Sequence, residues 1–289
     1  MAPGFEYFRP ESTASAVQLL AQFGGDAKIL AGGQSLMPLI NMRLAWPAVL
    51  IDINRIGELA FVREQDGWLV IGAMTRHAVL ERSEVVGRRN PLLAYATSLI
   101  AHPTIRARAT LGGSMAHADP AAEYPSVALA MGAELVALSQ RGERRIAAAT
   151  FFKGLLTTDL GEDELLVEVR LPEQPADEGW AYAELATRPG DYATVGVIAR
   201  LSLSGDGRCR TASLTCTAVG ATPLTARKAS AMLIGELPTH ANFDAAAALA
   251  AEEVTPDSDA LTSASYKRAM TRVMTRRALE AALRRAQNS

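Results

Sequence analysis

Two pairs of consecutive glycines lie far apart in the chain, and a polar residue follows each pair. The first glycine segment is Ala31-Gly32-Gly33-Gln34-Ser35, and the second is Thr110-Leu111-Gly112-Gly113-Ser114. Glycine accepts backbone torsions that other residues avoid, and it allows a ligand to approach the main chain closely. Successive N–H groups that turn inward can bind an anion. If the two segments meet in space, they could hold the diphosphate of a dinucleotide from opposite sides.

Either segment alone is weak evidence, because two glycines after a short strand are most often a tight turn. The sequence contains neither the Gly-x-Gly-x-x-Gly fingerprint of nicotinamide-binding folds nor a Walker A phosphate-binding loop. These absences argue against an ordinary Rossmann dehydrogenase and against a P-loop nucleotide hydrolase.

The composition limits the classes of partner. The chain has 289 residues, enough for two or three domains, and 29 basic residues against 31 acidic ones give a net charge of −2. This balance offers no attraction for nucleic acid or for an anionic membrane. We find no apolar stretch that could span a bilayer and no secretion signal, so we expect a cytoplasmic protein without a membrane span.

Metal-binding residues are scarce. The two cysteines, Cys209 and Cys216, are too few for an iron–sulfur cluster, which needs four thiolates. The four histidines show no spacing typical of zinc ligands. We therefore expect no metal on this chain, and any redox role would use an organic cofactor or metals on a partner.

The hydrophobic pattern predicts three successive units. In the first, a helix over 12–23 and strands over 28–30 and 48–53 flank a helix over 36–44. The second begins at Gly57 and contains strands, a helix over 75–82 capped by Thr75, an apolar helix over 91–102, and a strand over 165–171. The proline-rich, acidic stretch 172–179 is the best boundary, and strands at 183–187, 194–204 and 210–219 precede three helices.

Several motifs occur together in the order and spacing of a known family. They are Ala-Gly-Gly-Gln-Ser-Leu-Met-Pro at 31–38, Leu-Ile-Asp-Ile-Asn-Arg-Ile at 50–56, Ile-Gly-Ala-Met-Thr at 71–75, Thr-Leu-Gly-Gly-Ser at 110–114, Ala-Asp-Pro at 118–120 and Gly-Asp-Tyr-Ala-Thr-Val-Gly at 190–196. Over essentially its whole length the chain resembles the FAD-binding medium subunit of the molybdenum hydroxylases, the family of xanthine dehydrogenase and aerobic carbon monoxide dehydrogenase.

The resemblance implies an α+β fold of the PCMH type. Two α/β subdomains, here 1–56 and 57–175, would bind FAD. A C-terminal domain, here 176–289, would contain a three-stranded antiparallel sheet and a helical bundle.

The resemblance also implies which residues contact FAD. The glycine segments would contact its diphosphate, Glu123 would bind the cofactor through its carboxylate, Leu166 would line the flavin site, and Tyr192 would lie beside the isoalloxazine ring. The full set is Ala31, Gly32, Gly33, Gln34, Ser35, Leu36, Thr110, Gly112, Gly113, Ser114, Glu123, Leu166 and Tyr192. From the residues alone, Glu123 equally fits an acid at a helix N-terminus, and Tyr192 fits ordinary packing.

As a function, the resemblance implies an oxidoreductase subunit that transfers electrons. A large partner would carry the molybdenum cofactor, a small partner two [2Fe–2S] clusters, and FAD on this chain would pass electrons to an external acceptor. The family's heterotrimer is often doubled. The alternatives are a stand-alone FAD-dependent oxidase or dehydrogenase related to vanillyl-alcohol oxidase, and a subunit that no longer holds a cofactor.

Two residues depart from the family pattern. Gln34 stands where many relatives have histidine, which keeps a hydrogen-bonding side chain. Glu184 stands where many have lysine, which removes or reverses any ionic contact from that position.

Overall fold

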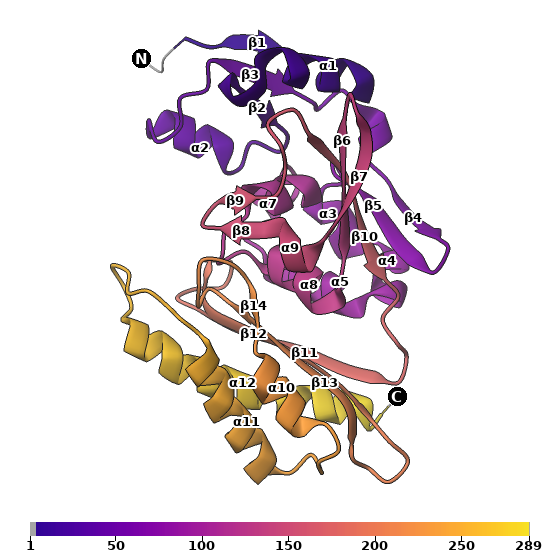
Figure 1. The fold of residues 1–289 in the computed structure, drawn as a ribbon, viewed down its shortest axis with the longest axis vertical. Helices are drawn as coiled ribbons and strands as arrows, with labels where there is room; N and C mark the ends of the chain where they lie inside the picture. The colour runs from indigo at the N-terminus through magenta and orange to yellow at the C-terminus, as the bar shows by residue number, and fades with distance from the viewer. Residues whose placement is uncertain (1–3, 289) are drawn as a thin grey trace.

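The computed structural model describes residues 4–288, in which three layered units follow one another along the long axis of the molecule (Figure 1). The first contains a parallel sheet in the order β1(Glu6–Phe8), β3(Val49–Asp52), β2(Ala27–Leu30). Helix α1(Thr13–Phe23) is capped at its N-terminus by Ser12, whose side chain accepts a hydrogen bond from the Ser15 amide. Helix α2(Leu36–Asn41) follows the first glycine segment.

The second unit is built on an antiparallel five-stranded sheet. Its order is β4(Val62–Gln65), β5(Trp68–Gly72), β10(Leu165–Pro172), β6(Glu134–Ser139), β7(Gly142–Ala147). Six helices belong to the same unit: α3(His77–Arg82), α4(Glu84–Arg89), α5(Pro91–Leu99), α6(Pro103–Arg106), α7(Leu111–His117) and α8(Glu123–Met131). The short α9(Ala148–Phe151) leads into the hairpin of β8(Phe152–Gly154) and β9(Thr157–Thr158).

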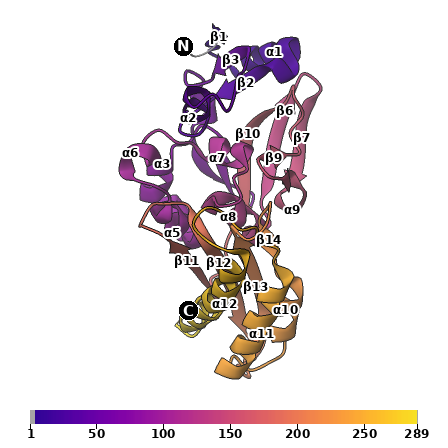
Figure 2. The ribbon, with the colours of Figure 1, turned by 90° about the vertical axis from the view of Figure 1, so that its left-hand side faces the viewer.

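Alternation along the strands gives this sheet two buried faces. Leu135 and Val169 pack into a large core with the helices, whereas Val136 and Val167 pack against α1 of the first unit. The first unit is therefore joined to the second through a shared core, and Figure 2 shows α1 above the edge of that sheet.

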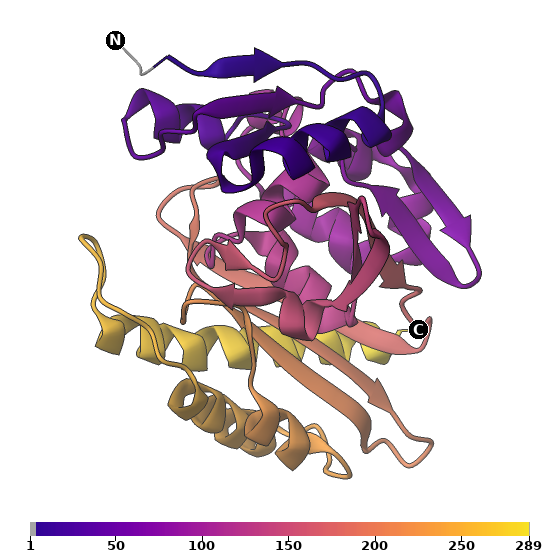
Figure 3. The ribbon, with the colours of Figure 1, turned by 45° about the horizontal axis from the view of Figure 1, so that its top comes forward.

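The C-terminal unit is an antiparallel sheet covered by helices. Strands β11(Glu178–Ala186), β12(Ala193–Leu203) and β13(Cys209–Thr217) are the three long strands that we expected, and the two-residue β14(Leu224–Thr225) adds a fourth at the edge. Helices α10(Arg227–Leu233), α11(His240–Glu253) and α12(Ala264–Ala286) pack with them around one core. Figure 3 shows α12, in yellow, running along this sheet.

Local structure differs from the sequence prediction at two places near the cavity described below. Thr75 does not cap a helix over 75–82. Its hydroxyl donates to the Phe61 carbonyl and accepts from the Phe61 amide, so α3 begins only at His77. The second glycine segment is not a loop either, because Leu111 to Ser114 form the first turn of α7. No helix between residues 4 and 288 is long and apolar enough to cross a membrane.

Candidate functional site

The two glycine segments touch each other, as their sequence suggested. A Cβ atom placed on Gly32 would lie 2.5 Å from the Arg108 carbonyl oxygen and 2.8 Å from the Ala109 Cα atom. On the other side, a Cβ atom on Gly113 would lie 3.9 Å from the Ala31 Cβ atom. The absence of side chains at these glycines therefore allows two distant stretches of main chain to approach each other. From the sequence we had attributed the glycines to the close approach of a ligand.

A cavity of about 510 Å³ lies between the segments. This central cavity is lined by every residue of the expected cofactor set: Ala31, Gly32, Gly33, Gln34, Ser35, Leu36, Thr110, Gly112, Gly113, Ser114, Glu123, Leu166 and Tyr192. Apolar residues such as Met74, Ile105 and Leu160 add to the wall. They were not predicted, because a lone aliphatic residue carries no sequence signal that separates a cavity wall from a core.

The first glycine segment presents its backbone amides. Gly33 has φ +72°, a left-handed conformation that side chains rarely adopt, and its carbonyl accepts the Met37 amide at 3.2 Å. Gln34 turns back and donates from Nε2 to the Gly32 carbonyl at 3.0 Å. Within residues 4–288, the N–H groups of Gly32, Gly33, Gln34 and Ser35 have no hydrogen-bond acceptor. These four donors are available to an anion.

The second glycine segment is different, because most of its amides are already used. The N–H groups of Leu111 and Gly112 donate to the carbonyls of Thr75 and Ala73, at 3.0 and 2.8 Å. The Gly113 amide donates to the Thr110 side chain at 3.2 Å, which caps α7. The two segments are therefore not equivalent, since hydrogen bonds to the residues that follow β5 and to the Thr110 side chain occupy the N–H groups of residues 111–113.

An acidic pair lies where the cavity meets the C-terminal sheet. Glu123, at the start of α8, is 5% exposed and lines the cavity. Burial and the nearby carboxyls of Glu184 and Asp119 raise its pKa to about 8. Glu184 on β11 has a buried Oε2 atom without a hydrogen-bond partner, and burial raises its pKa to about 7. Glu123 is therefore mostly protonated near neutral pH, and Glu184 is about half protonated.

Tyr192 and Leu166 occupy contrasting positions. Tyr192 lies at the edge of the cavity near Ser35, and 60% of its surface is exposed. The pKa of its hydroxyl is raised, mainly by partial burial and to a smaller extent by the charges of Asp119 and Glu123. Leu166 is buried and precedes a bulge in β10, where strand pairing shifts register. Thus an aromatic ring stands at the mouth and an aliphatic side chain lies inside.

His77 was not predicted, because a single histidine in a helical pattern is most often a core residue. His77 lines the cavity and is 3% exposed, and its ring packs edge-on against Tyr124 with 4.8 Å between the two ring centroids. Neither ring nitrogen reaches hydrogen-bond geometry with a partner, although the Thr110 backbone lies nearby. Burial lowers its pKa to about 4, so the imidazole is neutral at physiological pH.

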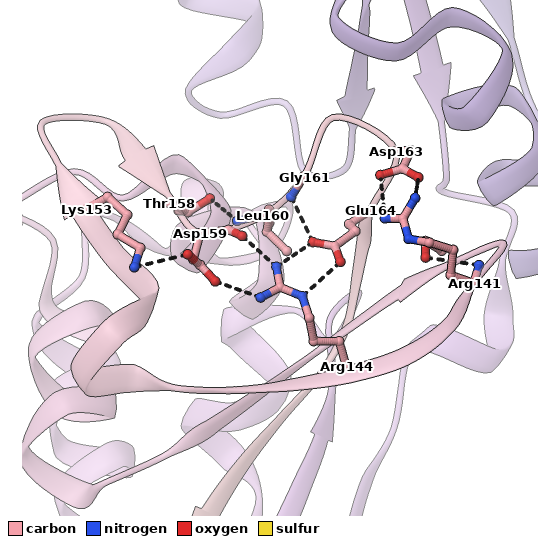
Figure 4. Close-up of polar contacts among 10 residues, drawn as sticks. Arg141, Arg144, Lys153, Thr158, Asp159, Leu160, Gly161, Asp163 and Glu164 are labelled. Atoms are coloured by element: carbon pink, nitrogen blue, oxygen red, sulfur yellow. Dashed lines mark hydrogen bonds and ion pairs between the residues drawn. The ribbon is translucent and has the colours of Figure 1, made fainter.

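An ion-pair network holds the loop that forms another wall of the cavity (Figure 4). Arg144 on β7 donates from Nε and Nη2 to the two oxygens of Glu164, at 2.9 and 2.7 Å, and from Nη1 to Asp159 at 2.7 Å. Lys153 contacts the other Asp159 oxygen at 3.0 Å. The side chain of Glu164 is only 6% exposed, so its charge depends on these donors.

Comparisons with known proteins identify the family to which the chain belongs. Residues 3–174 match the family described as "FAD binding domain in molybdopterin dehydrogenase", and residues 180–282 match "CO dehydrogenase flavoprotein C-terminal domain". The carbon monoxide dehydrogenase medium chain of Afipia carboxidovorans is 40% identical over 100% of both chains. Subunit alpha of the 6-hydroxypseudooxynicotine dehydrogenase complex of Paenarthrobacter nicotinovorans is 41% identical, over 98% of this chain and 96% of the relative.

Solved structures give the same result for the fold. A carbon monoxide dehydrogenase chain from Hydrogenophaga pseudoflava superposes with a TM-score of 0.96 at 44% identity, covering 99% of each chain. Quinoline 2-oxidoreductase from Pseudomonas putida 86 gives 0.93 at 37% identity, covering 98% of each chain. The chain therefore belongs to the FAD-binding medium subunits of the molybdenum hydroxylases, an oxidoreductase family, and has that family's α+β fold.

Proposed function

We propose that this chain is the electron-transfer subunit of a multi-subunit molybdenum hydroxylase. It receives electrons from [2Fe–2S] clusters on a small partner subunit and delivers them to an external acceptor. The large partner carries the molybdenum cofactor and hydroxylates the substrate. The observation that carries this proposal is the central cavity, into which both glycine segments open.

The residues around the cavity fit a flavin dinucleotide. Its volume of about 510 Å³ lies in the usual range for cofactor sites. The free amides of residues 32–35 suit the diphosphate, and the hydroxyls of Ser35 and Ser114 can donate to phosphate or ribityl oxygens. Leu166 and Tyr192 offer apolar and aromatic surface for the isoalloxazine ring.

Glu123 has a different role from the charged acceptor that the sequence suggested. A carboxylate beside a diphosphate would be repelled, whereas a protonated carboxyl donates one hydrogen bond and accepts others. Its raised pKa favours this neutral form at pH 7. Glu123 therefore binds a cofactor hydroxyl without adding negative charge to the site.

Bound FAD would supply the redox chemistry, because flavins exchange electrons both singly and in pairs. The chain's own residues hold and orient the cofactor. Exposure of Tyr192 keeps one side of the cavity accessible to an acceptor. No side chain of this chain needs to act on the hydroxylated substrate, so we assign no catalytic residue and no metal ligand here.

The oxidase alternative has no observation in its favour. Relatives that match the chain from end to end are named as medium chains or as complex subunits, which supports a partner-dependent role. We propose a dimer of heterotrimers, located in the cytoplasm as the two free, buried cysteines Cys209 and Cys216 suggest. We also propose 1–56, 57–175 and 176–289 as its domains.

The test is to co-express the chain with its proposed large and small partner subunits and to measure the FAD content and the mass of the assembly after gentle purification. We expect a flavin absorption spectrum, about one FAD per medium chain, and the mass of a doubled heterotrimer. The variant Ser114→Ala should weaken FAD retention, whereas Ser265→Ala, at an exposed position in the first turn of α12, should not. A fully assembled complex without flavin would refute the electron-transfer role.

A further inference from the structure

The contact between the two glycine segments is held by a pair of side chains outside the cavity wall. Asn54 follows β3, and its Nδ2 atom donates to the Ala31 carbonyl at 2.8 Å. Arg76 precedes α3, and its Nη2 atom donates to the Asn54 Oδ1 atom at 2.6 Å. The Nη1 atom of the same guanidinium donates to the Arg108 carbonyl. A continuous chain of hydrogen bonds thus joins the first glycine segment to the residues that lead into the second.

Both ends of this chain reach backbone atoms at the point of closest approach. The Arg108 carbonyl that accepts from Arg76 is also the atom that a Cβ on Gly32 would meet at 2.5 Å. Arg76 and Thr110 additionally form an isolated antiparallel bridge. The guanidinium therefore fixes the separation between two stretches of main chain that belong to different units.

The Asn54 side of the chain is itself rigidly supported. Asp52 accepts from the Asn54 amide at 2.9 Å and from its Nδ2 atom at 2.6 Å. The Tyr7 hydroxyl donates to the other Asp52 oxygen, Oδ2, at 2.5 Å, and the Arg9 Nε atom lies 3.6 Å from that same oxygen. Asn54 can therefore hold only one orientation, with its donor toward Ala31 and its acceptor toward Arg76.

Arg76 is not neutralised by an acid. Among residues 4–288, no carboxylate lies within ion-pair distance of either Arg76 or Arg108. Partial burial, and after it the charge of the Arg108 guanidinium, lower the pKa of Arg76, and the charge of Asp52 only partly opposes them. A planar fork that bonds two acceptors at fixed angles offsets this cost, which a lysine could not do.

We propose that Arg76 and Asn54 are positioning residues for the dinucleotide: by fixing the distance between the two glycine segments, they keep the cavity ready for the cofactor without touching it. This proposal rests on the binding of FAD in the central cavity. It predicts that affinity for FAD depends on the bidentate geometry of Arg76, and not merely on its positive charge.

The experiment uses the full-length chain, freed of flavin and titrated with FAD, with the co-expressed complex as a second preparation. The variants are Arg76→Met, Arg76→Lys, Asn54→Ala and the double variant Asn54→Ala/Arg76→Met. Arg82→Met is the matched control, because Arg82 is exposed at the other end of α3. Each variant is also unfolded without flavin, so that loss of folding is distinguished from loss of binding.

We expect Arg76→Met to weaken FAD binding by about tenfold, consistent with losing a hydrogen bond to a charged donor. Arg76→Lys should lie between the wild type and Arg76→Met, since lysine keeps the charge but reaches one acceptor. The double variant should be weakened far less than the product of the single effects, because both changes break one chain. Arg82→Met should bind FAD like the wild type.

Two results would overturn the proposal. If Arg76→Lys binds as tightly as the wild type while Arg76→Met is weak, charge alone matters and the positioning role is wrong. If every folded variant binds FAD normally, the hydrogen-bond chain has no part in binding. Failure of the wild type to bind FAD in either preparation would instead count against the cofactor site itself, so the two failures are distinguishable.

Discussion

Replacing Glu184 by glutamine should make the flavin-free protein more stable at alkaline pH. Glu184 on β11 and Glu123 on α8 are two carboxyls placed close together where the C-terminal sheet meets the cavity. One Glu184 oxygen is buried without a hydrogen-bond partner. When both groups ionise, the folded protein must hold two poorly solvated negative charges beside Asp119.

The sign of the effect follows from the raised pKa values. In the unfolded chain both carboxyls lose their protons near pH 4.5, whereas in the folded chain the pKa is about 8 for Glu123 and about 7 for Glu184. Between these limits the two carboxyls bind more protons in the folded state than in the unfolded state, so their contribution to the free energy of unfolding falls as pH rises from about 5 to 8. Since one pKa unit corresponds to about 1.4 kcal/mol, the rise of the Glu184 pKa from 4.5 to about 7 costs on the order of 3 kcal/mol at pH 8.

Urea unfolding of the flavin-free chain at pH 5, 6, 7 and 8 measures this cost. We expect Glu184→Gln to match the wild type within about 1 kcal/mol at pH 5, where Glu184 of the folded protein is protonated, and to be about 3 kcal/mol more stable at pH 8. Glu143→Gln, at an exposed position on β7, is the matched control and should follow the wild-type curve. A stability advantage of Glu184→Gln over the wild type that does not grow from pH 5 to 8 would refute the reasoning.

Other variants test packing and the cavity wall. Gly32→Ala places a methyl group 2.5 Å from the Arg108 carbonyl, so we expect about 1–3 kcal/mol of destabilisation and reduced FAD content, whereas Gly57→Ala, with no atom within 4 Å, should lack both effects. Gly87→Ala in α4 also meets no atom and should stabilise the chain by about 0.5–1 kcal/mol in thermal or urea unfolding. Arg144→Met strands the nearly buried Glu164 carboxylate and should cost about 1–3 kcal/mol. Its neighbour Arg145→Met loses a 3.6 Å ion pair with Glu134 that contains no hydrogen bond, and should cost under about 0.5 kcal/mol; equal losses would contradict the network's role.

Much of the site could be predicted from the sequence, because its parts carry strong local signals. Paired glycines mark places where another group approaches the main chain closely. Because two such pairs occur, we expected the two glycine segments to lie close together. Neither the pattern nor the resemblance could tell what each glycine contacts. The need for glycine at position 32 comes from Arg108, which lies 76 residues later in the chain.

The parts that were missed depend on long-range hydrogen bonds. The sequence around Thr75 is typical of a helix N-cap, but the Thr75 hydroxyl instead forms hydrogen bonds with the backbone amide and carbonyl of Phe61. From the sequence, the backbone amides of residues 111 and 112 were expected to be free donors. In the structure they donate to the carbonyls of Thr75 and Ala73, which follow β5. Strands as short as β1 and β14 contain too few residues for an alternating pattern to appear.

The unequal chemistry of the two glycine segments has a consequence for engineering. An N–H group belongs to nearly every amino acid, so donors on the first segment survive most exchanges at Gln34 or Ser35 that preserve the chain's path. The hydroxyl that the second segment offers through Ser114 disappears with a single codon change. A redesign aimed at loosening or retuning the flavin should therefore begin on the helical side, where one side chain can be altered without rebuilding the backbone.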